Sequence, residues 1–302
     1  MYDSATAISQ GCRSRQEDAV VADFPTGANG GFAILADGMG GHAAGDVASK
    51  IVVSEVFAAL KLRADDLSSN AGRIGALLQD AAEGANTSLG AYVAARPDQS
   101  GMGTTLLAPL VAGGALHWIS VGDSPLYLFR DGRGLRLNEN HAMAERLDQW
   151  VAEGRISEHA AQTHPDRHCV TSVLMGREVH EVDVDRAPVA LSAGDIILAA
   201  SDGIETLSLA EMADTLCTDI TLSSTALAEK LQQRVLDQAD PDQDNLAFCV
   251  IRVLPNGRPI APVVSPQSTQ QCKPRLRRLT FAAVASRREG ELAFETLTRS
   301  SS

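Results

Sequence analysis

Acidic residues stand at the ends of five apolar stretches of this chain, at four of them beside glycine or asparagine. They are Glu17-Asp18, Asp37-Gly38, Gly122-Asp123, Asp202-Gly203 and Asp244-Asn245. An apolar strand that ends in a carboxylate delivers it to the rim of a sheet, and a neighbouring glycine lets other backbone approach closely. Several such rims at one end of a layered protein would converge on an acidic cavity.

Clustered carboxylates raise one another's pKa unless a cation lies between them. Sites with only oxygen ligands favour hard ions, so Mg²⁺ or Mn²⁺ is expected. A carboxylate between two such ions can bridge them at roughly 4 Å, a spacing used for in-line phosphoryl displacement. One Asp-Gly after a strand is usually a turn, as we expect for Asp131-Gly132. Five acidic strand ends indicate a divalent-metal site, and the pattern alone names no reaction.

The elements that would position these residues follow from hydrophobic periodicity. Strands are predicted over 5–9, 19–23, 31–36, 105–111, 115–121, 126–130, 195–200 and 245–254. Helices are predicted over about 44–60, 74–93, 143–153 and 225–239. Gly113-Gly114 and Asp131-Gly132 indicate tight hairpins, and hence antiparallel sheet. The prediction is an α+β protein whose sheets pack on each other with helices outside.

Composition narrows the class of protein. The net charge of −12 argues against nucleic acid as a partner. No apolar stretch reaches the ~20 residues of a membrane span, and no secretory signal is visible, so a cytoplasmic protein is expected. The odd number of cysteines, without CxxC spacing, argues against a disulfide framework or zinc-thiolate site. Cys12 is expected to be a packed thiol.

The chain changes character near residue 255. Residues 255–302 are rich in Pro, Arg and Ser, and basic residues outnumber acidic ones there. This composition indicates a flexible tail after a domain over residues 1–254. A charged tail is usually solvated, although docking to a partner is an alternative.

The motifs resemble those of the protein phosphatase 2C family. Residues 13–18 resemble its Arg-x-x-Asn-Glu-Asp opening, and residues 36–45 resemble the form found in bacterial members. The later matches are Gly103-Thr104-Thr105, Val121-Gly122-Asp123-Ser124, Ser201-Asp202-Gly203-Ile204 and Asp244-Asn245, in the family's order, with a flap-like segment at His164–His168. The resemblance runs from about residue 11 to about 253, and the ordered set is specific.

The resemblance implies a central β-sandwich of two antiparallel sheets flanked by α-helices. It also implies two Mn²⁺ or Mg²⁺ ions and a weaker third. Asp37 would bridge the two ions. The other implied ligands are Asp202 and Asp244 for the first ion, Glu17 and the Gly38 carbonyl for the second, and Asp123 with Asp202 for the third. Arg13 would bind the substrate phosphate, with Asp18 as a near neighbour of the metals.

The activity implied by the resemblance is protein serine/threonine phosphatase, in which a metal-bridging hydroxide attacks phosphorus. Met39 stands where many eukaryotic relatives have a proton-donating histidine, so water, rather than nearby His42, is expected to protonate the leaving alkoxide. The alternatives are an inactive phosphatase-fold scaffold and a hydrolase of small phosphate esters. Expected partners are phosphoprotein substrates and a cognate Ser/Thr kinase, and the expected state is a monomer.

Overall fold

The structure, a computed structural model, describes residues 1–40, 44–63, 71–167, 169–219 and 221–255. These residues belong to one compact unit, Met1–Pro262. The tail expected over 255–302 lies almost wholly outside the described residues, as do His42 and His168 of the sequence analysis. The boundary near residue 255 therefore stays a prediction.

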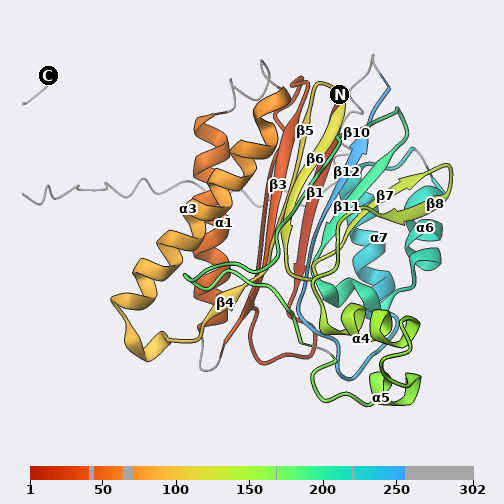
Figure 1. The fold of residues 1–302 in the computed structure, drawn as a ribbon. Coiled ribbons are helices and arrows are strands. Elements are labelled where there is room, and N and C mark those ends of the chain that lie inside the picture. Colours follow the sequence, from red (N-terminus) through yellow and green to blue (C-terminus); the bar gives the residue numbers. More distant parts are fainter. Residues whose placement is uncertain (41–43, 64–70, 168, 220, 256–302) are drawn as a thin grey trace, which may run out of the picture. The chain divides into compact units, whose positions relative to one another are not determined.

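Two antiparallel sheets form the centre of this unit (Figure 1). The five-stranded sheet has the order β1 (Tyr2–Ser9), β12 (Leu246–Val253), β11 (Ile196–Ala200), β7 (Leu126–Arg130), β8 (Arg133–Arg136). The seven-stranded sheet has the order β10 (Val189–Ala190), β6 (Ala115–Val121), β5 (Leu106–Ala112), β3 (Gly31–Met39), β2 (Asp18–Asp23), with β4 (Gly103–Thr104) paired to β3 and β9 (Asp183–Val184) paired to β6.

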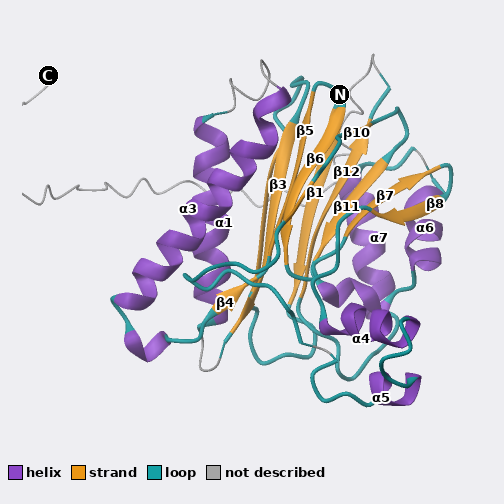
Figure 2. Cartoon of the chain, viewed as in Figure 1, coloured by secondary structure: helices purple, strands orange, loops and turns teal. Residues whose placement is uncertain are grey.

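Helices cover the outer face of each sheet, as Figure 2 shows. On the seven-stranded sheet they are α1 (Gly45–Leu62) and α3 (Ile74–Ala94). On the five-stranded sheet they are α6 (Leu209–Cys217) and α7 (Ser224–Leu236). Between β8 and β9 lie α4 (Met143–Ala152) and α5 (Glu158–Gln162), and short 3₁₀ turns occupy η1 (Ala71–Arg73), η2 (Pro97–Gln99) and η3 (Asp202–Thr206). The predicted α+β class, with packed sheets and outer helices, is confirmed.

Strand β12 shows why the sheets are buried on both faces. Successive side chains of a strand point to opposite faces. Phe248 and Val250 pack against the helices of the five-stranded sheet. Cys249 and Ile251 pack against the other sheet. A strand between two packed layers needs apolar side chains on both faces, and the whole of β12 is buried.

The two predicted hairpins are present. Strands β5 and β6 pair across Gly113-Gly114, and β7 and β8 pair across Asp131-Gly132. Asp131 and Gly132 have φ values of 53° and 75°, so both lie in the left-handed region that a two-residue hairpin turn requires. Among the described residues, no helix is long and apolar enough to cross a bilayer.

Two leucines of α7 give a matched test of the packing. Leu231 is 0% exposed and Leu236 is 50% exposed. We expect Leu231→Ala to lower the free energy of unfolding by about 2–5 kcal/mol, because it leaves a cavity in the core. Leu236→Ala should change it by about 0.5 kcal/mol or less. Urea denaturation of both variants measures the difference, and equal losses would contradict this packing.

Candidate metal centre

A cavity of about 750 Å³ opens at one rim of the two sheets. It is lined by Arg13, Ser14, Arg15, Glu17, Asp37, Gly38, Met39, Gly40, Asp123, Cys169, Val170, Val173, Asp202, Asp244 and Asn245. All of the site residues predicted from the sequence are in this set except Asp18. The structure therefore brings together carboxylates that are far apart in the sequence.

Strand ends from both sheets deliver these carboxylates. Asp37 lies near the end of β3, in the seven-stranded sheet. Asp202 follows β11 and Asp244 precedes β12, and these two strands pair antiparallel in the five-stranded sheet. The end of one strand therefore lies beside the start of the other. Asp123 follows β6 by two residues.

Backbone contacts fix Asp37 in place. Its N–H donates to Thr105 Oγ1 at 2.9 Å, and its carbonyl accepts from Thr105 N at 2.9 Å and from Thr104 Oγ1 at 2.7 Å. Both threonines belong to the Gly103-Thr104-Thr105 motif. That motif holds the main chain of Asp37 and leaves its carboxylate to the cavity.

Glu17 and Gly38 are held together by α1. The Glu17 carbonyl accepts from Gly38 N at 3.1 Å and from the buried Ser49 hydroxyl at 2.5 Å. A Cβ on Gly38 would overlap the carbonyl oxygen of Gly45, the first residue of α1. Glycine is required here by this close approach of helix to strand.

The electrostatics of the cavity are unfavourable for ionised carboxylates. Burial, with a smaller contribution from neighbouring carboxylates, raises the pKa of Asp18 and of Asp202 to about 7. Burial, together with the charges of Asp18 and Asp202, raises the pKa of Asp37 well above its usual range. Burial also raises the pKa of Asp123. A divalent cation among these groups would relieve both desolvation and repulsion.

Two orphaned oxygens support the same conclusion. Asp18 Oδ1 and Asp202 Oδ1 are buried and have no hydrogen-bond partner. A buried polar atom without a partner is costly unless something else satisfies it. Unsatisfied carboxylate oxygens are the ligands that Mg²⁺ and Mn²⁺ prefer, so the residues fit the implied metals.

Asp18 lies behind the cavity wall. It sits directly opposite Asp37 across the β2–β3 ladder and is 3% exposed. Its Oδ2 accepts from Ser201 Oγ at 2.7 Å. This position fits a neighbour of the metal ligands and gives it no access to substrate.

The carboxylates share a cavity but do not form a finished coordination sphere. In the part of the chain that the structure describes, no three His, Cys, Asp or Glu side chains are already grouped to hold an ion. Like charges repel, so separated carboxylates are expected where no cation draws them together. Asp244 accepts instead from Arg13 Nη2 at 2.5 Å. The side chains of Arg13 and Asp244 are 59% and 36% exposed, so water screens this ion pair and it is weak.

Some residues of the cavity were not foreseen. Arg15 and Asn245 stand inside motifs that we recognised, but neither received a role. Cys169 and Val170 directly follow the flap-like segment at His164–His168, but neither was given a role. Cys12 was wrongly expected to be a packed thiol: it is exposed, with Sγ 3.6 Å from the Asp240 carbonyl oxygen. Its backbone N–H also donates to the Gln243 carbonyl at 2.8 Å.

The model of a known family, described as protein phosphatase 2C, matches residues 10–234. The chain belongs to the protein phosphatase 2C family. This match covers every predicted site residue except Asp244, which lies just beyond it. Membership of the protein phosphatase 2C family agrees with the metal-dependent site described above.

Named relatives come from several bacteria. The chain is 40% identical over 192 residues to the serine/threonine protein phosphatase PstP of Mycobacterium tuberculosis, an alignment that covers 64% of this chain and 34% of that protein. It is 36% identical over 194 residues to the serine/threonine phosphatase stp of Listeria innocua, covering 64% and 74% respectively. The chain thus spans about a third of the length of the mycobacterial relative.

A solved structure supports metal binding in this protein phosphatase 2C fold. The catalytic domain of PstP in complex with two manganese ions superposes with a TM-score of 0.65 at 31% identity. The match covers 84% of this chain and 99% of that one. Metal dependence is thus a property of the family to which the chain belongs.

The raised carboxyl pKa values predict how pH affects the metal-free protein. Asp18 and Asp202 have an ordinary pKa of 3.8, which rises to about 7 in the folded state. The folded state therefore binds more protons than the unfolded chain between these values, and stability falls as pH rises through that window. With EDTA, we expect the melting temperature to fall between about pH 4 and pH 7. The melting temperature of Asp202→Asn should fall less, and excess Mn²⁺ should abolish the fall in the wild-type protein. A drop of equal size in wild type and variant would contradict this account.

Proposed function

We propose that this chain is a metal-dependent protein serine/threonine phosphatase, which hydrolyses phosphoserine and phosphothreonine monoesters. The observation that carries the proposal is the gathering of Glu17, Asp37, Asp202 and Asp244 around one cavity that Arg13 also lines. Acidic ligands for cations beside a guanidinium for phosphate are the parts that phosphoryl transfer needs.

The proposed ligands are the predicted ones. Asp37 would bridge two ions, Asp202 and Asp244 would complete the first ion's ligands, and Glu17 and the Gly38 carbonyl would hold the second. Asp123, with Asp202, would hold a weaker third ion. Mn²⁺ or Mg²⁺ fits this oxygen-only set. When bound, the ions polarise phosphate oxygens and lower the pKa of a water molecule.

The chain's own residues bind and orient the substrate. Arg13 can exchange the exposed Asp244 carboxylate for phosphate oxygens, because its paired donors match either group. None of the described residues that line the cavity is a histidine, and Met39 cannot donate a proton. Water therefore remains the proposed proton donor to the leaving alkoxide.

The substrates would be products of serine/threonine kinases, and the site of action would be the cytoplasm. The fit of the cavity supports the first statement, since it is an open acidic cavity with a positively charged residue at its wall. The free thiols of Cys12, Cys169, Cys217 and Cys249 support the second, because a reducing compartment keeps cysteines unpaired. Small phosphate esters would use the same chemistry and differ only in the surface that they contact.

Loss of a ligand carboxylate should abolish activity while sparing the fold. We expect Asp37→Asn and Asp202→Asn to lower kcat/KM on a phosphothreonine peptide by about 10³-fold or more, because each loses several kcal/mol of metal-based stabilisation. Assays with Mn²⁺, with Mg²⁺ and with chelator, beside circular dichroism, measure this. Wild-type protein that hydrolyses nucleotides but not phosphopeptides would overturn the proposed substrate class. Full activity in chelator would overturn the mechanism.

Arg13 should act on phosphate binding. We expect Arg13→Ala to reduce kcat/KM by about 10- to 100-fold, mainly through KM, because a charge-assisted paired contact is lost. Arg13→Lys should recover part of the loss, since it keeps the charge without the paired donors. The control is Arg186→Ala, since the Arg186 side chain is 93% exposed and does not line the cavity. Equal kinetics of Arg13→Ala and the control would remove Arg13 from the site.

A further inference from the structure

Both the oxygen and the nitrogen of the Asn245 side-chain amide make hydrogen bonds. Its Oδ1 accepts from Glu17 N at 2.8 Å, and its Nδ2 donates to the carbonyls of Gln10 and Arg15, each at 2.8 Å. The side chain is buried, and the residue is 6% exposed. The three partners lie 228 to 235 residues away in the sequence, so these are tertiary contacts and not a local turn.

The three contacts span one short loop. Residues 10–17 connect β1 to β2 and carry Arg13 and Arg15 into the cavity. Asn245 holds the loop at Gln10 on one side of Arg13 and at Arg15 and Glu17 on the other. Within the loop, Gln10 Nε2 donates to the Arg13 carbonyl at 2.7 Å. The amide of Asn245 therefore brackets the residue proposed to bind phosphate.

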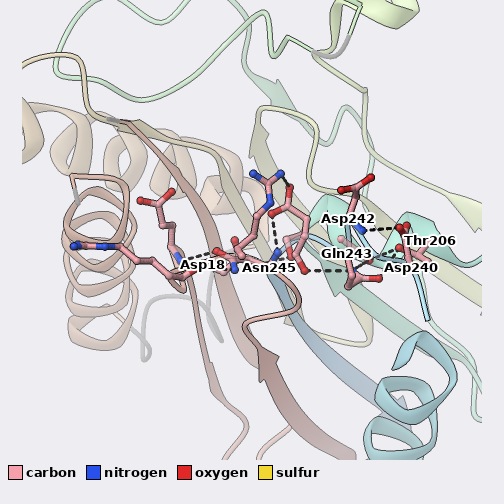
Figure 3. Close-up of polar contacts among 12 residues, drawn as sticks. Asp18, Thr206, Asp240, Asp242, Gln243 and Asn245 are labelled. Carbon is pink, nitrogen blue, oxygen red and sulfur yellow. Dashed lines mark hydrogen bonds and ion pairs between the residues drawn. The ribbon is translucent and has the colours of Figure 1, made fainter. Parts of the chain in front are cut away.

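Gln243, close to Asn245 in the sequence, also contacts the loop and is itself held by η3. Figure 3 shows Thr206, Gln243 and Asn245. Cys12 N donates to the Gln243 carbonyl at 2.8 Å. The Gln243 side chain is in turn held by Thr206 Oγ1 at 2.8 Å and by the Gly203 carbonyl at 3.0 Å. Residues 243–245 are thus anchored to η3, which carries Asp202, before they contact the loop.

We propose that Asn245 is a positioning residue that sets Arg13 for the substrate phosphate by tying loop 10–17 to the strand start that supplies Asp244. This inference rests on the proposed phosphatase function and adds a residue to it. The phosphate-binding loop and a metal ligand are then held in register by one side chain, because Asn245 directly follows Asp244. A shift of about 1 Å in such a group can cost about a hundredfold in rate.

The chemistry of the contacts requires an amide. Only a group with two donors and an acceptor can satisfy two carbonyls and one N–H at once. Asn245→Ala would leave all three backbone groups without this partner. Asn245→Asp keeps the acceptor but loses both donors, so it should release the Gln10 and Arg15 carbonyls.

A double-mutant cycle with Arg13 tests the proposal. We expect Asn245→Ala to lower kcat/KM on a phosphothreonine peptide by about 10- to 100-fold and to weaken inhibition by inorganic phosphate. In an Arg13→Ala background the same change should cost less than about threefold, because the residue it positions is already gone. Additive losses would overturn the proposal.

Asn138 provides the matched control. It is also 6% exposed, and its amide also makes three contacts, with Leu126 N at 2.8 Å, Ser120 Oγ at 3.1 Å and the Ser124 carbonyl at 3.0 Å. Asn138→Ala should cost comparable stability, while any loss of activity should add to that of Arg13→Ala. A purely structural role for Asn245 would make the two asparagines behave alike, and that result would overturn the proposal.

Hydrogen exchange gives a readout that does not depend on turnover. Amides of residues 10–17 should exchange faster in Asn245→Ala than in wild type, and at the wild-type rate in Asn138→Ala. Unchanged exchange in Asn245→Ala would contradict the attachment even if activity fell. Should wild type show no phosphatase activity, the proposed function fails, whereas the exchange result still decides whether Asn245 holds the loop.

Discussion

Repulsion among buried carboxylates is the constraint on which the rest of this structure depends. Burial raises the pKa of Asp18, Asp37, Asp123 and Asp202, and neighbouring carboxylates raise each of them as well. A chain left to itself would separate them or expose them to water. The two packed sheets keep them around one cavity, because their apolar cores fix the strand ends from which these side chains project.

Hydrogen bonds to the main chain fix the positions of Asp37 and Glu17. Their carboxylate oxygens therefore remain available to the cavity. Thr104 and Thr105 hold the backbone of Asp37, and Ser49 with Gly38 holds that of Glu17. Hydrogen bonds from these groups to carboxylate oxygens would have satisfied the acids internally and weakened them as metal ligands. The arrangement keeps the acids under electrostatic stress, which a divalent cation can relieve.

Most of the longer strands and helices could be predicted from the sequence, because hydrophobic periodicity and turn residues mark them. The β6 and β7 bounds were predicted as observed, because each is a buried run closed by a turn. Strand β8 was missed, since a four-residue edge strand with alternating exposure carries little signal. Helix α6 was also missed, although Ser208 and Glu211 form a capping box that could have marked its start. The role of Asn245 was unreadable, because its partners lie at the other end of the sequence.

The origin of the ligands has a consequence for the fold as a whole. Asp37 comes from the seven-stranded sheet, whereas Asp202 and Asp244 flank strands of the five-stranded one. An ion bound by all three would cross-link the two sheets, much as a disulfide cross-links two segments of a chain. The stabilisation that such an ion gives to the folded state would increase with the concentration of free cation. Bound cation would thereby stabilise the folded state against unfolding, apart from any part that it takes in hydrolysis.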